Sequence, residues 1–436
     1  MFGIYPVNPD ESLCASIAWS LWSEGRLATT LLQGALPGIE HSVYWTPPLY
    51  YLVLAGWMGL FGPGLLAVRS LSLILGLVLI VVLWQRHRSV GVTAWTSCAL
   101  VLFDPSLQGA ASMARMDMLA ITLTAGSLTW LEVGRDERRY LGVGALAAAA
   151  ILTHPLGAAA MAAAGLTSLL RGRRLVLLFL AGSVPLLLAW GVYIALDVDT
   201  FVAQMQLQLA VKSGRAQSPL GNLQRLAELS GPLAPVLAVA FVGGLAGLIA
   251  GWRELLPWLI GAVCLAPLAL FSGELVYPAY MAPFTAVGLG YWLQLSRWAR
   301  RAVLVAVLAL SMALIMDRPP LAGIDPTYEL YCSYLSDHIG PGNTVLFAIL
   351  PDPWFGFQHR TDLQLRVAPP VVIDMPQLDA YVGAADLVLF GGYNPPGFIS
   401  IIKRWDEVAH PGEHLWILEG GELHDFANVR DRVRFR

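Results

Sequence analysis

The chain alternates long apolar runs with short loops rich in arginine, and this alternation constrains its fold more than any other feature. Of the 436 residues, 56% are hydrophobic and only 13% are charged, whereas about a quarter of the residues in a soluble domain are charged. We therefore expect an α-helical multi-pass membrane protein of about 10–11 spans. The runs long enough to cross, or nearly cross, a bilayer are residues 65–84, 91–104, 113–133, 140–153, 155–170, 175–196, 231–251, 255–271, 279–295 and 302–316.

The arginines occupy every second loop between these runs, and the intervening short loops hold almost no basic residues, apart from Arg115 at one edge. By the positive-inside rule, the arginine loops face the cytoplasm. The other loops then face outward, so we expect a plasma (inner) membrane protein with its active site and C-terminal domain on the outer, periplasmic face. The arginines that define the pattern are Arg86, Arg88, Arg135, Arg138, Arg139, Arg171, Arg173, Arg174, Arg253, Arg297, Arg300 and Arg301.

The part before the first run and the part after the last run both belong to the outer face. Residues 1–64 form an outer loop with two juxtamembrane helices, at 11–25 and 47–62, whose Trp and Tyr side chains suit a membrane interface. Residues 65–316 form the transmembrane helical domain. Because the outer loop has no span before it, we expect one further span upstream.

Residues 317–436 differ in composition, with more Asp, Glu, His and Pro and no long apolar run. Short strand-like segments alternate there with helix-like ones, which predicts a small extracytoplasmic α/β domain. The strand-like segments are residues 344–350, 369–373, 386–392 and 414–420, and the helix-like ones are 328–339, 377–384 and 398–408.

The outer loop contains the sequence N-P-D-E at the start of its first helix. Asn8 suits the N-cap, Pro9 suits the first helical position, and Glu11 can complete a capping box. On this interpretation Glu11 holds the start of the helix, and Asp10 is left to face the outer surface. Asp10 is then the better candidate for chemistry.

Polar side chains gather at the outward ends of the spans. Charged groups in or beside a membrane span are costly, and are candidates for function for that reason. Cations at headgroup level can hold a lipid phosphate, and a carboxylate beside them can act as a base. The set comprises Asp10, Glu11, Glu40, His41, Trp45, Arg115, Asp117, His154, Lys212, Arg215, Arg225, Glu274, Tyr277 and Tyr280.

Each of these residues also has a structural interpretation. Arg115 and Asp117 could neutralise one another at the interface, and His154 could satisfy backbone groups freed at a proline break. Tyr277 and Tyr280 could belong to an aromatic belt. Together, however, the residues predict an outward polar pocket. The four cysteines show no metal-ligand spacing, so no cofactor is required, although a divalent cation stays open.

Several motifs agree in order and spacing with a known family across residues 8–295. On these motifs the chain resembles the membrane glycosyltransferases of the C-superfamily, in the branch with the protein O-mannosyltransferases and the lipid A aminoarabinose transferases. The motifs are D-E (10–11), S-E-G (23–25), T-P-P-L-Y-Y (46–51), L-F-G-P (60–63), A-V-R-S-L-S (67–72), A-R-M-D-M-L (114–119), L-T-H-P-L-G (152–157) and Y-P-A-Y-M-A-P (277–283).

The resemblance implies transfer of a sugar from a polyprenyl-phosphate donor to a protein, lipid or glycan acceptor on the outer face, with inversion. It implies that Asp10, with Glu11 beside it, is the base or the group that positions the acceptor. Membrane lipids are expected partners, whereas the net charge of −3 does not suggest nucleic acid. The expected donor-binding residues are Arg115, Asp117, His154, Lys212, Arg215 and Tyr280, and the expected acceptor-side or pocket residues are His41, Trp45, Glu274 and Tyr277.

Two positions depart from the family pattern. Thr46 stands where relatives often have Lys or His, and His154 stands where they have Lys. A histidine is charged only part of the time near neutral pH. We therefore expect Arg115, Lys212 or Arg215 to supply the charge that a donor phosphate needs.

Two other classes of function stay open on the sequence alone. A transporter or lipid flippase would carry polar residues throughout its spans or an internal repeat, and the spans here are mostly Leu, Ala, Val and Gly. A catalytically inactive scaffold for envelope assembly is compatible with the changes at Thr46 and His154.

Overall fold

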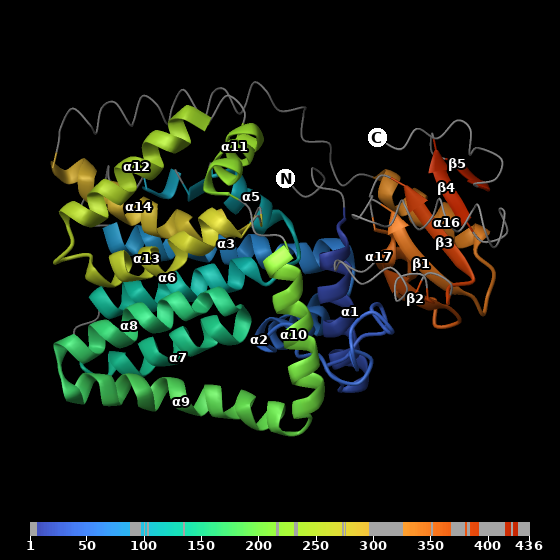
Figure 1. Ribbon diagram of the computed structural model, residues 1–436, viewed down its shortest axis with the longest axis horizontal. Helices are drawn as coiled ribbons and strands as arrows, with labels where there is room; N and C mark the ends of the chain where they lie inside the picture. The colour runs from blue at the N-terminus through green and yellow to red at the C-terminus, as the bar shows by residue number, and fades with distance from the viewer. Residues whose placement is uncertain are drawn as a thin grey trace.

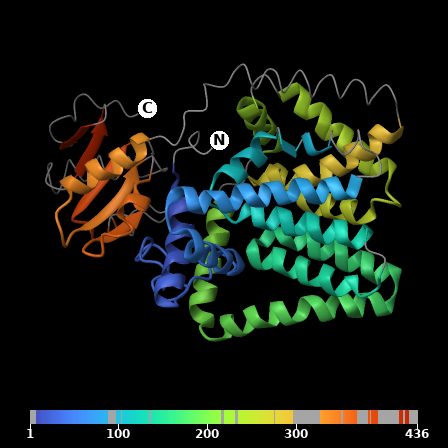
Figure 2. The ribbon, with the colours of Figure 1, turned by 180° about the vertical axis from the view of Figure 1, so that it is seen from behind.

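The protein consists of a large helical part and a smaller part built on a β-sheet, with the N-terminal helix between them (Figure 1; Figure 2). The expectation of a mostly helical chain with a small C-terminal sheet is confirmed. The computed structural model describes residues 7–87, 97–99, 101–102, 104–133, 136–214, 218–230, 234–272, 274, 276–295, 326–349, 352–367, 380–381, 384–391, 415–419 and 422–425.

The first helix, α1 (Pro9–Glu24), starts with the predicted capping box. The Asn8 side chain accepts a hydrogen bond from the Asp10 N–H at 2.7 Å, and the Glu11 carboxylate accepts one from the Asn8 N–H at 3.2 Å. The helix ends at Gly25, whose φ of 69° is the left-handed conformation that glycine adopts without strain. Both ends therefore follow from local sequence.

The remaining helices up to residue 295 form a bundle. In Figure 1, α3, α6, α7, α8, α9 and α13 run roughly along one direction, and α10 crosses their ends. The elements are α2 (Leu49–Phe61), α3 (Leu65–His87), α5 (Pro105–Ser112), α6 (Asp117–Val133), α7 (Arg139–Thr153), η1 (Pro155–Gly157), α8 (Ala158–Arg171), α9 (Arg173–Ala195), α10 (Val198–Gly214), α11 (Pro219–Ser230), α12 (Ala234–Ala250), α13 (Leu256–Phe271) and α14 (Tyr277–Leu295).

Two of the described helices are long and apolar enough to cross a bilayer, judged by length and composition: Leu65–Arg86 and Arg173–Ala195. Shorter apolar helices lie at Leu49–Phe61, Arg139–Thr153, Ala238–Ala250 and Leu256–Phe271. The predicted runs at 91–104 and 302–316 fall largely or wholly outside the described residues.

Glycines allow the closest approaches between helices of the bundle. A Cβ atom placed on Gly182 of α9 would lie 2.0 Å from the Leu141 carbonyl oxygen of α7, and one on Gly144 of α7 would lie 2.1 Å from the Phe179 carbonyl oxygen. Small residues of this kind let backbones pack directly against each other, as in membrane helix pairs. The α7–α9 contact therefore tolerates no side chain at these positions.

We expect Gly182→Ala to destabilise the protein by about 1–3 kcal/mol, because the added methyl group would overlap backbone that cannot move aside. Gly191→Ala, on the same helix, is the matched control: a Cβ there meets nothing within 4 Å. Thermal unfolding of the detergent-solubilised protein measures both. Equal midpoints for the two variants would contradict the close packing.

The C-terminal part contains α16 (Pro326–His338), α17 (Trp354–Phe357) and a sheet of order β2-β1-β3-β4-β5 in its described residues. Strands β2 (Gln364–Val367), β1 (Thr344–Ile349), β3 (Leu387–Gly391) and β4 (Leu415–Glu419) are parallel, and β5 (Glu422–Asp425) is antiparallel to β4.

Three of the predicted strands, at 344–350, 386–392 and 414–420, are confirmed as β1, β3 and β4. The segment at 369–373 lies outside the described residues, and β2 and β5 were not expected. Apolar residues of α1, such as Leu13 and Ile17, share one hydrophobic cluster with sheet residues such as Phe347 and Val388. The sheet is thereby attached to the start of the helical part.

Candidate functional site

Glu11 is a fully buried carboxylate held by four donors. Arg69 of α3 forms a two-pronged ion pair with it, with Nε 2.9 Å from Oε1 and Nη2 2.7 Å from Oε2. The backbone N–H groups of Ala114 and Asn8 complete the set at 2.8 and 3.2 Å. Such charge-assisted pairs are strong and geometrically specific. Glu11 therefore joins α1 to α3 and to the segment before α6, and we interpret it as a positioning residue.

Arg69 was missed as a site residue in the sequence. It lies in the A-V-R-S-L-S motif, inside a long apolar run, and its side chain is only 2% exposed. A charged residue within such a run is costly and needs a partner, so its position was a usable signal. The identity of the partner was not readable, because Glu11 lies 58 residues away along the chain.

Asp10 begins a line of charged and polar groups. Its carboxylate pairs with Nη1 of Arg115, and Nε of Arg115 lies 3.0 Å from the carboxylate of Asp117. The Tyr280 hydroxyl donates a hydrogen bond to Asp117 at 3.1 Å. Asp117 is fully buried, whereas the Asp10 side chain is 39% exposed. Asp10 is thus the acid of this line that a substrate can reach.

Aromatic contacts continue the line. The His154 ring centroid lies 5.3 Å from that of Tyr280 and 5.9 Å from that of Tyr277. The Lys212 ammonium lies 5.6 Å from the Tyr277 ring centroid and 2.6 Å from the Glu274 carboxylate. The residues joined in this way, called here the polar cluster, are Asp10, Arg115, Asp117, His154, Lys212, Glu274, Tyr277 and Tyr280.

His154 does not supply a positive charge near neutral pH. Burial lowers the pKa of His154 to about 4, against the opposing effect of the Asp117 charge. Its Nδ1 accepts a hydrogen bond from the Leu156 N–H at 3.1 Å. The proton of the neutral ring is therefore on Nε2, which can donate to a ligand.

Every cation of the polar cluster is already paired with a carboxylate. Arg115 lies between Asp10 and Asp117, and Lys212 lies against Glu274. With His154 neutral, the cluster carries one more negative than positive charge. A phosphate could therefore bind a cation here only by sharing it with, or displacing, a carboxylate.

Helix α10 carries Lys212 and is held by the outer loop. The Gln204 amide accepts from the Tyr44 N–H at 2.7 Å and donates to the carbonyls of Pro37 and Ser42 at 2.8 and 2.9 Å. One turn further, Gln208 donates to the Trp45 carbonyl at 2.7 Å. The loop thus sets the position of α10.

Three of the predicted site residues that the structure describes are not part of the polar cluster: Glu11, which forms the separate buried ion pair with Arg69, and His41 and Trp45. His41 is exposed, 3.8 Å from Glu40, and Trp45 is half-buried in the outer loop. Among the described residues, no hydrogen bond, ion pair or ring contact joins either of them to the cluster. Arg215 lies outside the described residues, as does the Arg225 side chain. Thr46 contacts the Tyr51 hydroxyl.

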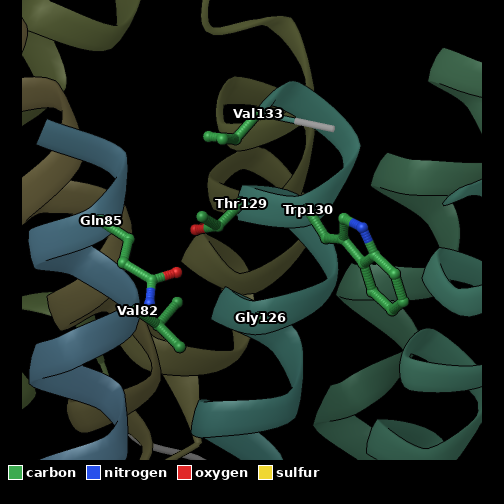
Figure 3. Close-up of a pocket in the computed structure, with 6 residues that line it drawn as sticks. All are labelled: Val82, Gln85, Gly126, Thr129, Trp130 and Val133. Atoms are coloured by element: carbon green, nitrogen blue, oxygen red, sulfur yellow. The ribbon is translucent and has the colours of Figure 1, made fainter. Parts of the chain in front are cut away.

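A hollow of about 380 Å³ lies elsewhere, between α3 and α6 (Figure 3). None of the residues of the polar cluster lines it. Its lining residues are Val82, Gln85, Gly126, Thr129, Trp130 and Val133. Within the described ranges, no group of three or more His, Cys, Asp and Glu side chains is arranged to hold a metal ion.

Comparison with known proteins identifies the fold. Over 98% of this chain and 91% of that chain, the structure superposes on ArnT from Cupriavidus metallidurans bound to undecaprenyl phosphate, with a TM-score of 0.60 and 14% identity. The apo form of the same protein gives 0.58 and 16%, over 98% of this chain and 90% of that chain. The chain has an ArnT-like fold. The predicted resemblance to C-superfamily membrane glycosyltransferases is confirmed at the level of fold.

A further solved structure superposes on this chain with a lower TM-score. The oligosaccharyltransferase AglB from Archaeoglobus fulgidus, in complex with an inhibitory peptide and a dolichol-phosphate, gives a TM-score of 0.43 at 11% identity, over 82% of this chain and 64% of that chain. No protein-family model matches the sequence, and no curated protein matches it.

We expect Arg69→Leu to destabilise the protein by about 3–5 kcal/mol, because it leaves the buried Glu11 carboxylate without its countercharge. The double variant Glu11→Gln/Arg69→Leu should recover part of that loss, since no unpaired charge remains. Asp10→Asn, at a half-exposed position one residue away, is the control and should unfold near the wild-type temperature. Thermal unfolding of the wild type and these three variants tests this, and a double variant no more stable than Arg69→Leu would contradict it.

Proposed function

We propose that this protein is a membrane enzyme that transfers a sugar from a polyprenyl-phosphate donor to an acceptor. The observation that carries the proposal is the half-exposed Asp10 carboxylate at the edge of the polar cluster, in a chain with an ArnT-like fold. The solved ArnT structure is bound to undecaprenyl phosphate, and a lipid phosphate of this class is the donor carrier that we infer.

Exposed apolar side chains support a membrane location. On α9, the large side chains Leu177, Leu188 and Val192 are all more than half exposed, which water would not favour on a contiguous surface. The arginine pattern orients the polar cluster toward the outer face. We propose a multi-pass protein of the plasma (inner) membrane, with the C-terminal domain, called here the tail, on that same outer side.

The proposed reaction is a single displacement at the anomeric carbon of the donor sugar. The acceptor oxygen forms the new bond, and the bond from carbon to the phosphate oxygen breaks, with its electron pair leaving on the polyprenyl phosphate. Asp10 orients the acceptor and takes up its proton. Arg115 and Lys212 stabilise the charge that develops on the leaving phosphate. Attack from the opposite face inverts the anomeric centre.

The ion pairs of Lys212 and Arg115 determine how the donor phosphate can bind to these two cations. Lys212 is 38% exposed at its side chain and is held by Glu274. Arg115 uses Nε and Nη1 for its two carboxylates, and Nη2 has no hydrogen-bond partner among the described residues. We infer that the donor phosphate displaces Glu274 from Lys212 and accepts a hydrogen bond from Nη2 of Arg115. The Nε2–H of His154 can donate a further hydrogen bond to the phosphate.

Asp10→Asn should abolish transfer, lowering the rate by at least about a thousandfold, because the amide cannot accept the proton. The measurement follows label from lipid-linked sugars, extracted from metabolically labelled cells, into protein, lipid and glycan fractions. The variant should still bind undecaprenyl phosphate and unfold near the wild-type temperature. The matched control is Glu24→Gln, an exposed acid at the far end of the same helix.

Other outcomes of this assay would replace the proposal. Near-normal transfer by Asp10→Asn would remove Asp10 from the reaction. Movement of the labelled lipid across a vesicle membrane, with no undecaprenyl phosphate released, would identify a transporter or flippase. Binding of undecaprenyl phosphate without transfer by the wild type would favour an inactive scaffold.

Glu274→Gln should tighten binding of undecaprenyl phosphate by about tenfold, because the phosphate no longer competes with a carboxylate for Lys212. Lys212→Ala should weaken binding by a similar factor. Native mass spectrometry or a lipid-dependent shift in unfolding temperature measures both in detergent. Weaker binding by Glu274→Gln would show that Glu274 assists the phosphate instead of competing with it.

A further inference from the structure

The C-terminal sheet meets the helical part through the edge at which parallel sheets bind ligands. In doubly wound sheets of order 2-1-3, ligands bind beyond the carboxyl ends of the strands, where the strand order reverses next to β1. Here the Val367 N–H, at the carboxyl end of β2, donates to the Leu31 carbonyl at 2.9 Å. The Tyr381 hydroxyl oxygen lies 3.1 and 2.8 Å from the carbonyl oxygens of Leu31 and Val367, and its one proton can be donated to either. The outer loop therefore covers this edge.

Asp352 follows β1 at the same edge and is fully buried against α1. Its Oδ1 accepts hydrogen bonds from the Ser12 hydroxyl at 2.7 Å and from the Trp354 N–H at 2.9 Å. Its own N–H donates to the Val7 carbonyl at 2.8 Å. The Tyr328 hydroxyl donates to the Asp352 carbonyl at 2.7 Å. Asp352 thus joins the tail to the start of α1 by hydrogen bonds to Ser12 and Val7, and this attachment is called here the grip on α1.

Three consecutive residues of α1 point to three different parts of the protein. Successive residues of a helix are turned by about 100° about its axis. Asp10 points to Arg115, Glu11 to Arg69 of α3, and Ser12 to Asp352 of the tail. Because Glu11 and Ser12 are both fully buried, their two contacts set the rotation of the first turn. That rotation decides where the Asp10 carboxylate lies.

We propose that Asp352 is a positioning residue, through which the C-terminal domain sets the rotation of the first turn of α1 and so aims the Asp10 carboxylate at the polar cluster. The tail is then a part of the active site's framework. The consequence for transfer rests on the function proposed above for Asp10, whereas the grip on α1 can be tested without it.

The charge state of Asp352 gives this contact a pH dependence. Burial, together with the nearby Glu11 charge, raises the pKa of Asp352 to about 6, against the lowering effect of the hydrogen bonds from Trp354 and Ser12. The titratable groups that face it are Glu11 from α1 and Tyr328 and Cys332 from α16. Oδ2 has no partner among the described residues. A raised carboxyl pKa stabilises docking at low pH, and this stabilisation is lost as the pH rises through about 6.

Hydrogen–deuterium exchange of the full-length protein in detergent tests the grip on α1. Asp352→Ala removes the acceptor of Ser12, and the amides of residues 10–16 should exchange at least about tenfold faster. Asp352→Asn keeps an acceptor oxygen and resembles the protonated acid, so it should restore protection. Asp337→Ala is the matched control, an exposed acid of α16 in the same domain. Equal exchange in Asp352→Ala and Asp337→Ala would overturn the proposal.

The pH profile separates positioning from simple stabilisation. After correction for intrinsic exchange rates, protection of residues 10–16 in the wild type should fall by about tenfold between pH 5 and pH 7.5. In Asp352→Asn it should stay level and exceed that of the wild type at pH 7.5. An Asp352→Asn profile that still falls as in the wild type would assign the change to another group and overturn the role of Asp352.

Transfer measurements then connect the grip to the reaction. In Asp352→Ala, kcat should fall by about tenfold with the KM for the lipid-linked donor unchanged, because Arg115 and Lys212 lie in the helical part. Asp352→Asn should recover the rate. An unchanged kcat alongside faster exchange in α1 would overturn the aiming of Asp10. If the wild type transfers no sugar, the proposed function fails, and the exchange data still decide whether Asp352 sets the first turn.

Discussion

The buried ion pair between Glu11 and Arg69 is the interaction on which the rest of the site depends. A charge inside an apolar helix is tolerable only with a countercharge and enough hydrogen bonds, and Glu11 receives four. One of these comes from the Ala114 N–H. Asp10 precedes Glu11 and Arg115 follows Ala114, so the contacts of Glu11 also bring the Asp10–Arg115 ion pair together.

The two acids of the D-E motif thereby divide two tasks that need opposite environments. Glu11 is sealed among donors and holds three segments together, whereas Asp10 keeps enough exposed surface to meet a substrate. A buried carboxylate fixes the geometry here, and its accessible neighbour is the acid proposed for the chemistry. Because Arg115 and Lys212 are both paired with acids, we propose that a phosphate would bind by exchange of partners.

The strand order of the tail domain and its contacts together indicate what the carboxyl edge of its sheet does. A parallel sheet with the reversal next to β1 would ordinarily offer its carboxyl edge to a small ligand. In this protein the edge holds the outer loop and the first turn of α1 through Leu31, Ser12 and Val7. The edge is therefore used for attachment, and the attached element carries the acid proposed for catalysis.

Much of this organisation could be predicted from the sequence, because it depends on patterns only a few residues long. The capping box of α1, its end at Gly25, and most apolar helices followed from local preferences and hydropathy. The polar cluster was foreseeable in part, since topology brings the outward ends of helices to one side. The strand β2 was not, because QLRV is only four residues long and is defined by its pairing with β1.

What only the tertiary structure decided is which polar group meets which. Arg69 and Glu11 are separated by 58 residues, and Ser12 and Asp352 by 340. By itself the sequence determined that Asp10 and Glu11 start a capped helix, and that an arginine sits inside an apolar run. It could not determine their partners, because the energy of a buried charge depends on atoms brought close by packing of the whole chain, and not on neighbours along it.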